Sequence, residues 1–394
     1  MHACTIVTLG LRPSPGPSIG CVVQVQAAPP TCNIIIIMAT SESKLRDELV
    51  QFKIENVEGL QRSLEGKSGE FGSSGELCKV TVKEVPRMAK RLQSIMSSSD
   101  IRPSEKRGIQ EKFYKECLLL SELEHPNVIE FIGVHFSRVD RSDVSMILEP
   151  MHSDLETYLN PDERPNVPLS IKLSILFDVS AGLLCLHTQL DQPLLHCNLT
   201  AQNILLSKDL RAKISSFGVS KLLKFSHPNE IATYIQQPDT VAHLPPELLC
   251  DNPQYDTHLD VFLFGQLALH IANQQFPDVN DDVMDTELNL AFHFKELLKR
   301  KRWIDMLPLN HCLRGVILKC LQDQPTQRLT TYQLYYTVKD LSLKNPKSLQ
   351  DVIMAWGDKT EVFHAYGYNT VYSDPDTQFV YYIIGFVYIA KWRV

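Results

Sequence analysis

The sequence lacks several features that mark common classes of protein. Its ten cysteines never form a C-x-x-C pair, so the spacing of a zinc motif is absent. It has no basic run, and its net charge of −7 argues against a nucleic-acid-binding protein. No internal repeat is visible. Isolated cysteines in apolar surroundings are typical of reduced thiols, so we expect a cytoplasmic protein. The cysteines are Cys4, Cys21, Cys32, Cys78, Cys117, Cys185, Cys197, Cys250, Cys312 and Cys320.

What the composition does contain is ordinary for a soluble globular chain. Apolar residues make up 44% and charged residues 22% of the sequence. A length of 394 residues fits roughly two or three domains, or one large unit with two lobes.

The two ends differ in composition from the middle. Residues 1–37 are rich in Pro, Ser, Gly and Cys and carry no charge except Arg12, without the basic start and clean apolar core of a secretory signal. We expect either a disordered extension or a true start at Met38. The apolar stretch 379–390 is shorter than the roughly twenty residues that span a bilayer. It indicates a packed strand or a gene-model artefact rather than a truncated membrane segment, and membrane binding is not expected.

Two motifs in the middle carry the functional signal. Residues 196–203 (HCNLTAQN) resemble the H-R-D-L-x-x-x-N catalytic loop of protein kinases, and residues 215–218 (SSFG) resemble the D-F-G turn. Both aspartates are missing: Asn198 stands at the position of the catalytic base, and Ser216 at that of the metal-binding aspartate.

Further motifs follow in the order and spacing of a protein kinase domain. They are residues 80–83 (VTVK, similar to V-A-I-K), 113–116 (FYKE, in the αC helix) with 125–127 (HPN), 146–151 (MILEPM, the strand and hinge), 244–247 (LPPE, similar to A-P-E), 260–265 (DVFLFG, start of the αF helix) and 320–328 (CLQDQPTQR). The chain therefore resembles the protein kinase superfamily, of the tyrosine-kinase or tyrosine-kinase-like type.

The resemblance implies an α+β, two-lobed protein kinase fold over residues 58–345. The N-lobe, 58–150, would hold a small antiparallel sheet with αC. The C-lobe, 151–345, would be larger and mainly helical. Residues 1–57 and 346–394 would be extensions, the second of unknown structure.

The resemblance also implies a nucleotide site. Lys83 would hold the phosphates and pair with Glu116, because an unpaired lysine in a dry site is costly. Glycines let the backbone approach phosphates, although the candidate loop at 66–72 departs from the family spacing. Thr81 would replace the alanine that faces adenine. The remaining residues implied at the cofactor are Gly69, Gly72, Leu148, Glu149, Met151 and Leu205.

The substitutions predict impaired chemistry. Asn198 can orient a hydroxyl but cannot accept its proton, and the loss of a general base costs about 10²–10⁴ in rate. Asn203 matches one metal ligand, but Ser216 offers a neutral hydroxyl where Mg²⁺ prefers a carboxylate. We expect weak ATP binding, a doubtful Mg²⁺ site, and a pseudokinase that acts as a scaffold or allosteric partner of other signalling proteins or kinases. The alternatives are an active, atypical ATP-dependent kinase for Ser/Thr or Tyr, and a magnesium-independent ATP-binding sensor that uses Lys83 and Glu116.

Overall fold

The structure is a computed structural model of the chain. It describes residues 42–60, 76–92, 102–137, 144–164, 166–217, 221–222, 245–249, 256–274, 304–305, 307–347, 370–374, 379–384 and 387–393.

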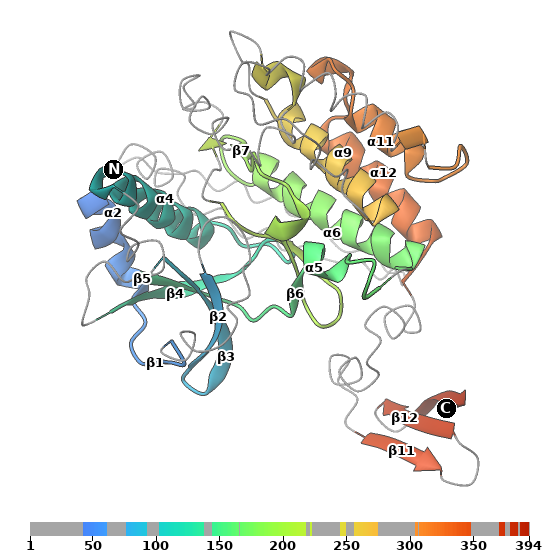
Figure 1. Ribbon diagram of the computed structural model, residues 1–394, viewed down its shortest axis with the longest axis horizontal. Coiled ribbons are helices and arrows are strands. Elements are labelled where there is room, and N and C mark those ends of the chain that lie inside the picture. The colour runs from blue at the N-terminus through green and yellow to red at the C-terminus, as the bar shows by residue number, and fades with distance from the viewer. Residues whose placement is uncertain are drawn as a thin grey trace, which may run out of the picture. The chain divides into compact units, whose positions relative to one another are not determined.

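The N-lobe is built on a five-stranded antiparallel sheet with the strand order β1-β2-β3-β5-β4 (Figure 1). Strand β3 lies in the middle of the sheet, where both of its edges are paired. Their bounds are Val57–Glu58 (β1), Glu76–Val82 (β2), Val85–Arg91 (β3), Phe131–Phe136 (β4) and Val144–Leu148 (β5).

One long helix, α4 (Pro103–Ser121), packs against this sheet. Proline at its first position fixes its start, and the Glu105 carboxylate accepts the backbone N–H of Arg102 at 3.3 Å. Its apolar residues recur at helical spacing and form the buried face, which also carries Glu116.

A short helix, α2 (Glu42–Leu49), lies against α4. Its Leu45 and Leu49 are completely buried and belong to the same apolar core as α4. The packed N-lobe therefore begins ahead of residue 58.

The C-lobe is mainly helical, with small sheets near its border with the N-lobe. Its helices are α5 (Leu155–Tyr158), α6 (Leu169–Thr188), α9 (His258–Asn273), α11 (Arg314–Cys320) and α12 (Thr331–Lys344). Its strands are β6 (Ser153–Asp154), β7 (Leu194–Leu195), β8 (Ile204–Leu206), β9 (Ala212–Ile214) and β10 (Lys221–Leu222). The expected α+β, two-lobed kinase fold is confirmed.

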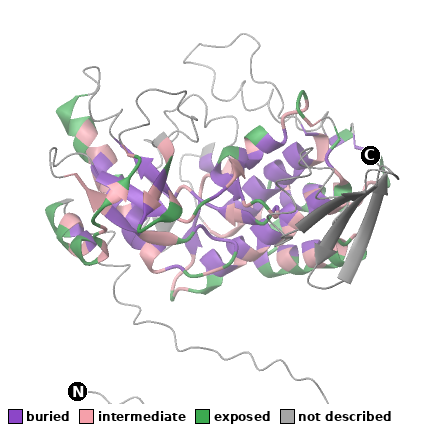
Figure 2. Ribbon diagram, turned by 90° about the horizontal axis from the view of Figure 1, so that it is seen from below, coloured by how far each residue is buried: buried purple, intermediate pink, exposed green. Residues whose placement is uncertain are grey.

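Helix α6 is apolar enough, by length and composition, to cross a membrane. Most of its apolar window is buried inside the protein, where the helix packs against α9 and α12. Figure 2 shows buried segments concentrated in the interior of both lobes. Such burial is typical of the core helix of a folded domain.

The chain ends in a separate three-stranded antiparallel sheet of β11 (Thr370–Asp374), β12 (Phe379–Ile384) and β13 (Val387–Arg393). The stretch 379–390 thus forms β12 and part of β13, and the expectation of strand structure there is confirmed. The predictions for residues 1–37 lie outside the described residues.

Candidate functional site

A buried ion pair connects the centre of the N-lobe sheet with helix α4. Lys90 Nζ, on β3, lies 2.8 and 2.9 Å from the two carboxylate oxygens of Glu116. The two side chains are only 6% and 3% exposed. The same carboxylate accepts the backbone N–H of Phe217 at 3.0 Å, so it binds the start of the activation segment as well. The predicted role of Glu116 as the partner of a buried lysine is confirmed.

The predicted lysine is wrong. Lys83 does not pair with Glu116, because it lies exposed in the two-residue turn between β2 and β3. Its place is taken by Lys90, seven positions later on β3. The residue two positions before the paired lysine is consequently Met88, and Thr81 lies on the neighbouring strand β2.

The number of residues between Gly72 and the lysine was the signal in the sequence that could have identified Lys90. Lys83 follows Gly72 by only eleven residues, too few for two strands and a turn, whereas Lys90 follows it by eighteen. Gly69 and Gly72 themselves lie outside the described residues.

Asp260, at the start of α9, binds the backbone of the catalytic loop. Its carboxylate accepts the backbone N–H groups of His196 and Cys197, both at 2.8 Å, and contacts His187 Nε2 at 2.9 Å. Complete burial on its own raises the pKa of Asp260, but the bonds and charge of His187 and His196 outweigh burial and lower it. Asp260 is therefore a fixed anion that sets the loop backbone, including the left-handed conformation of Cys197 (φ 62°).

Asn198 and Asn203 are brought together within this loop. The Asn203 side-chain amide donates to the backbone oxygen of Asn198 at 2.9 Å and to Thr200 Oγ1 at 3.1 Å. These bonds fix the amide and leave its oxygen, Oδ1, as the group that can act as a ligand. The geometry is that of an assembled catalytic loop in which an amide replaces the carboxylate of the base.

Ser216 lies directly before Phe217, and its neighbour Ser215 donates its backbone N–H and its hydroxyl to Asn203 O, each at 2.9 Å. Its backbone is left-handed, with φ 66°. Phe217 stacks edge-on against His196, with ring centroids 5.1 Å apart, and His196 Nε2 donates to Ser215 O at 2.9 Å. Burial lowers the pKa of His196, which favours the neutral ring, and Nδ1 accepts the Asn198 N–H at 3.3 Å. These contacts bind the turn that contains Ser216 and Phe217 to the catalytic loop.

Three of the residues implied at the cofactor lie in the apolar core of the domain. Leu148, Met151 and Leu205 are 3%, 8% and 2% exposed, and they belong to one cluster that also contains Met88. Glu149 differs, because its carboxylate is taken up by Lys213 Nζ at 2.6 Å and by a backbone N–H at 2.8 Å. Its side chain is thus held by the protein itself.

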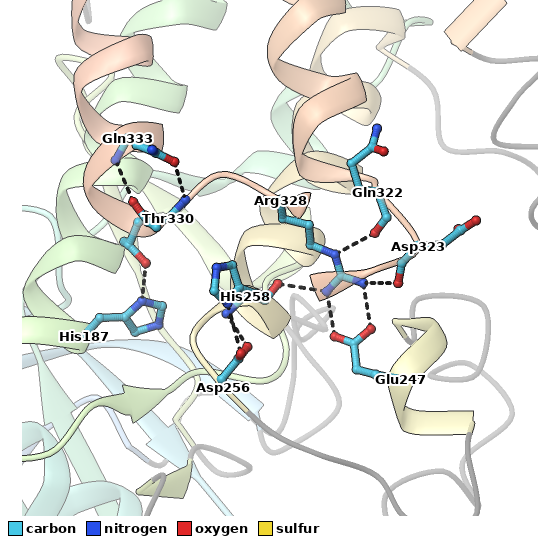
Figure 3. A network of polar contacts seen from close by, with 10 residues as sticks. His187, Glu247, Asp256, His258, Gln322, Asp323, Arg328, Thr330 and Gln333 are labelled. Atoms are coloured by element: carbon cyan, nitrogen blue, oxygen red, sulfur yellow. Dashed lines mark hydrogen bonds and ion pairs between the residues drawn. The ribbon is translucent and has the colours of Figure 1, made fainter. Parts of the chain in front are cut away.

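A second buried ion pair anchors the far end of the activation segment (Figure 3). Arg328 contacts both carboxylate oxygens of Glu247, at 2.6 and 2.7 Å, in a bidentate arrangement. The guanidinium also donates to the backbone oxygens of Gln322 and His258, at 2.7 and 3.1 Å. The kinase resemblance implies that Glu247 and Arg328, which belong to the motifs 244–247 and 320–328, form a buried pair, and this prediction is confirmed.

Comparison with known proteins agrees with this geometry. A family model described as "Protein kinase domain" matches residues 71–337, which is well over half of the chain. The chain therefore belongs to the protein kinase family, whose domains generally bind ATP.

The named relatives are protein kinases whose sequence identity to this chain is low. The chain is 24% identical over 260 residues to serine/threonine-protein kinase VIK of Arabidopsis thaliana, covering 65% of this chain and 55% of that one. It is 25% identical over 313 residues to a putative cysteine-rich receptor-like protein kinase of the same plant (75% and 45%). It is 28% identical over 210 residues to a probable serine/threonine-protein kinase of Dictyostelium discoideum (53% and 19%).

The chain thus spans at most about half of these relatives' lengths. Two of the three are named as serine/threonine kinases, and the tyrosine-kinase or tyrosine-kinase-like lineage stays a prediction.

Proposed function

We propose that this protein is a catalytically impaired kinase, a pseudokinase, that acts as a scaffold or allosteric partner of other signalling proteins or kinases. The observation that carries the proposal is the contrast between an assembled site and its missing carboxylates. Lys90–Glu116 and the His196–Phe217 stack are in place, so the domain has the shape that a partner would recognise.

Phosphoryl transfer relies on metal ions that neutralise the phosphates and on a group that receives the proton of the substrate hydroxyl. Asn198 cannot accept a proton at neutral pH. At the two positions implied for metal binding, Asn203 contributes an amide oxygen and Ser216 a hydroxyl. This donor set has no carboxylate, and Mg²⁺ is normally held through at least one. We therefore propose that these residues form a poor metal site.

One observation favours the alternative of an active, atypical kinase. The buried Lys90–Glu116 pair and the fixed amide of Asn203 retain two parts of the transfer machinery. Phosphate transfer would need both parts, whereas a scaffold would need the ion pair only for the stability of the fold.

Transfer of labelled γ-phosphate from ATP separates these two functions. The full chain is incubated with Mg²⁺ or Mn²⁺ and a generic protein substrate, with Lys90→Met as the site control and Lys83→Met as the matched surface control. The proposal predicts incorporation no higher than that of Lys90→Met. Incorporation that persists in Lys83→Met and disappears in Lys90→Met would show an active kinase.

A further inference from the structure

One hydrogen bond joins the N-lobe sheet to the segment that leads into the C-lobe. The backbone N–H of Met151 donates to the thioether sulfur of Met88, with N and Sδ 3.0 Å apart. Met88 lies on β3 directly opposite Leu148, the last residue of β5. Met151 follows Leu148 by only three residues, so it is within reach of the Met88 side chain. Met88 therefore lies next to residues that the kinase resemblance assigns to the nucleotide.

The acceptor is unusual for its position. A buried backbone N–H almost always has a strong partner, and a thioether is only a weak acceptor. The neighbouring donors follow the rule: Glu149 N–H bonds to Glu130 O at 3.2 Å, and His152 N–H bonds to Leu206 O at 2.8 Å. Within residues 149–152, Met151 is the one N–H bonded to sulfur, since Pro150 has none.

The surrounding side chains are already covered by the chain itself. Met88 and Met151 are each 8% exposed, and Leu148 and Leu205 are almost completely buried in the same cluster. An adenine ring needs apolar side chains to lie on and a backbone donor for one of its nitrogens. Here Met88 contacts the donor itself and lies opposite Leu148 across strands β3 and β5.

We propose that Met88 closes the adenine position of this domain, with its thioether in the place of the adenine nitrogen that would accept the Met151 N–H. An adenine nucleotide then binds only when Met88 rotates away. Its apparent affinity is lowered by the fraction of molecules in which the position is open. Methionine suits this role because its unbranched side chain fills irregular space and changes rotamer readily.

The inference does not depend on the missing carboxylates. It concerns binding of the base, whereas the proposed function concerns transfer of the phosphate. Adenosine is therefore the sharpest probe, because it has no phosphates and needs no metal ion.

The test is calorimetric titration of the full chain with adenosine, and with ATP in EDTA. Met88→Ala removes both the bulk and the acceptor, and it is expected to bind adenosine at least about tenfold more tightly than the natural chain, which corresponds to about 1.4 kcal/mol. Met146→Ala is the matched control, since Met146 is completely buried on β5 and the same truncation there leaves the Met88–Met151 contact untouched. It is expected to show no gain.

Two results would overturn the proposal. The first is a folded Met88→Ala that binds adenosine no better than the natural chain or Met146→Ala. The second is tight ATP binding by the natural chain that is lost in Lys90→Met. Should Met88→Ala fail to fold, Met88→Val provides a shorter residue that suits a strand and lacks the acceptor, and the titration of the natural chain still decides the second result.

Discussion

One carboxylate oxygen of Glu116 accepts hydrogen bonds from Lys90 Nζ and from the backbone N–H of Phe217, at 2.8 and 3.0 Å. A single side chain on α4 therefore connects β3 with the turn that begins the activation segment. The pair is almost fully buried, so each charge depends on the other for its stability. This contact fixes the domain in an assembled arrangement even though the catalytic aspartates are absent.

Replacing Lys90 by Met is expected to lower the free energy of unfolding by about 3–5 kcal/mol, because Glu116 would be left as an uncompensated buried charge. Lys83→Met, at the exposed turn, should change it by less than about 0.5 kcal/mol. Urea denaturation of the two variants measures both values. Equal effects would contradict the assignment of Lys90.

The same logic applies to the activation-segment anchor. Glu247→Gln is expected to destabilise the protein by about 3 kcal/mol, since Arg328 loses the charge of a bidentate partner in a buried position. Asp340→Asn breaks the exposed pair of Asp340 with Lys344 on α12 and should cost about 0.5 kcal/mol at most. Thermal or urea unfolding gives the comparison, and a loss no larger at Glu247 than at Asp340 would argue against a structural anchor.

Ser216 holds a left-handed backbone that costs a residue with a Cβ about 1–2 kcal/mol. Ser216→Gly removes this strain and should raise the free energy of unfolding by up to about 1 kcal/mol, after the entropy lost by glycine on folding is deducted. Ser215→Gly is the control, because Ser215 Oγ donates to Asn203 O at 2.9 Å and its loss should destabilise. Opposite signs at adjacent serines are the expected outcome; a destabilised Ser216→Gly would contradict the backbone assignment.

Acid should weaken the fold through His196. Burial lowers the pKa of His196 below its ordinary value of 6.5, so the unfolded chain takes up a proton more readily than the folded one. Stability is therefore greatest well above pH 6.5, is lost as the pH falls through that value, and is lower at about pH 5.5 than at about pH 7.5. His196→Phe keeps a ring against Phe217 and should reduce this fall. Denaturant unfolding at the two pH values measures it, and an unchanged pH dependence would mean that other groups, such as His125 and His311, account for it.

Sequence patterns were sufficient for the fold and for most of the frame. Long-spaced motifs located Glu116, His196, Asp260 and the Glu247–Arg328 pair, because each combines a chemical residue type with a fixed distance from its neighbours. Such patterns survive even where local detail departs from the family.

The sequence misled at the β2–β3 hairpin. Val82 pairs with Val85 across a two-residue turn in which Lys83 and Glu84 both have positive φ, of 48° and 65°. Such turns normally carry Asn-Gly or a similar pair. Without that signal the strand motif at 80–83 was a better match to V-A-I-K than the true one at 87–90. The contact of Met88 with Met151 joins residues far apart in the chain and has no local signature.

We propose that the two missing carboxylates, in an otherwise assembled site, limit phosphate transfer. The most direct measurement compares the labelled-phosphate rate of Met88→Ala with that of the same chain carrying Asn198→Asp and Ser216→Asp, so that both have equal access for ATP. We predict a rate at least about 10²-fold higher in the chain with the restored aspartates. Equal rates in the two chains, both abolished by Lys90→Met, would contradict the claim and show that the natural site is already an active kinase.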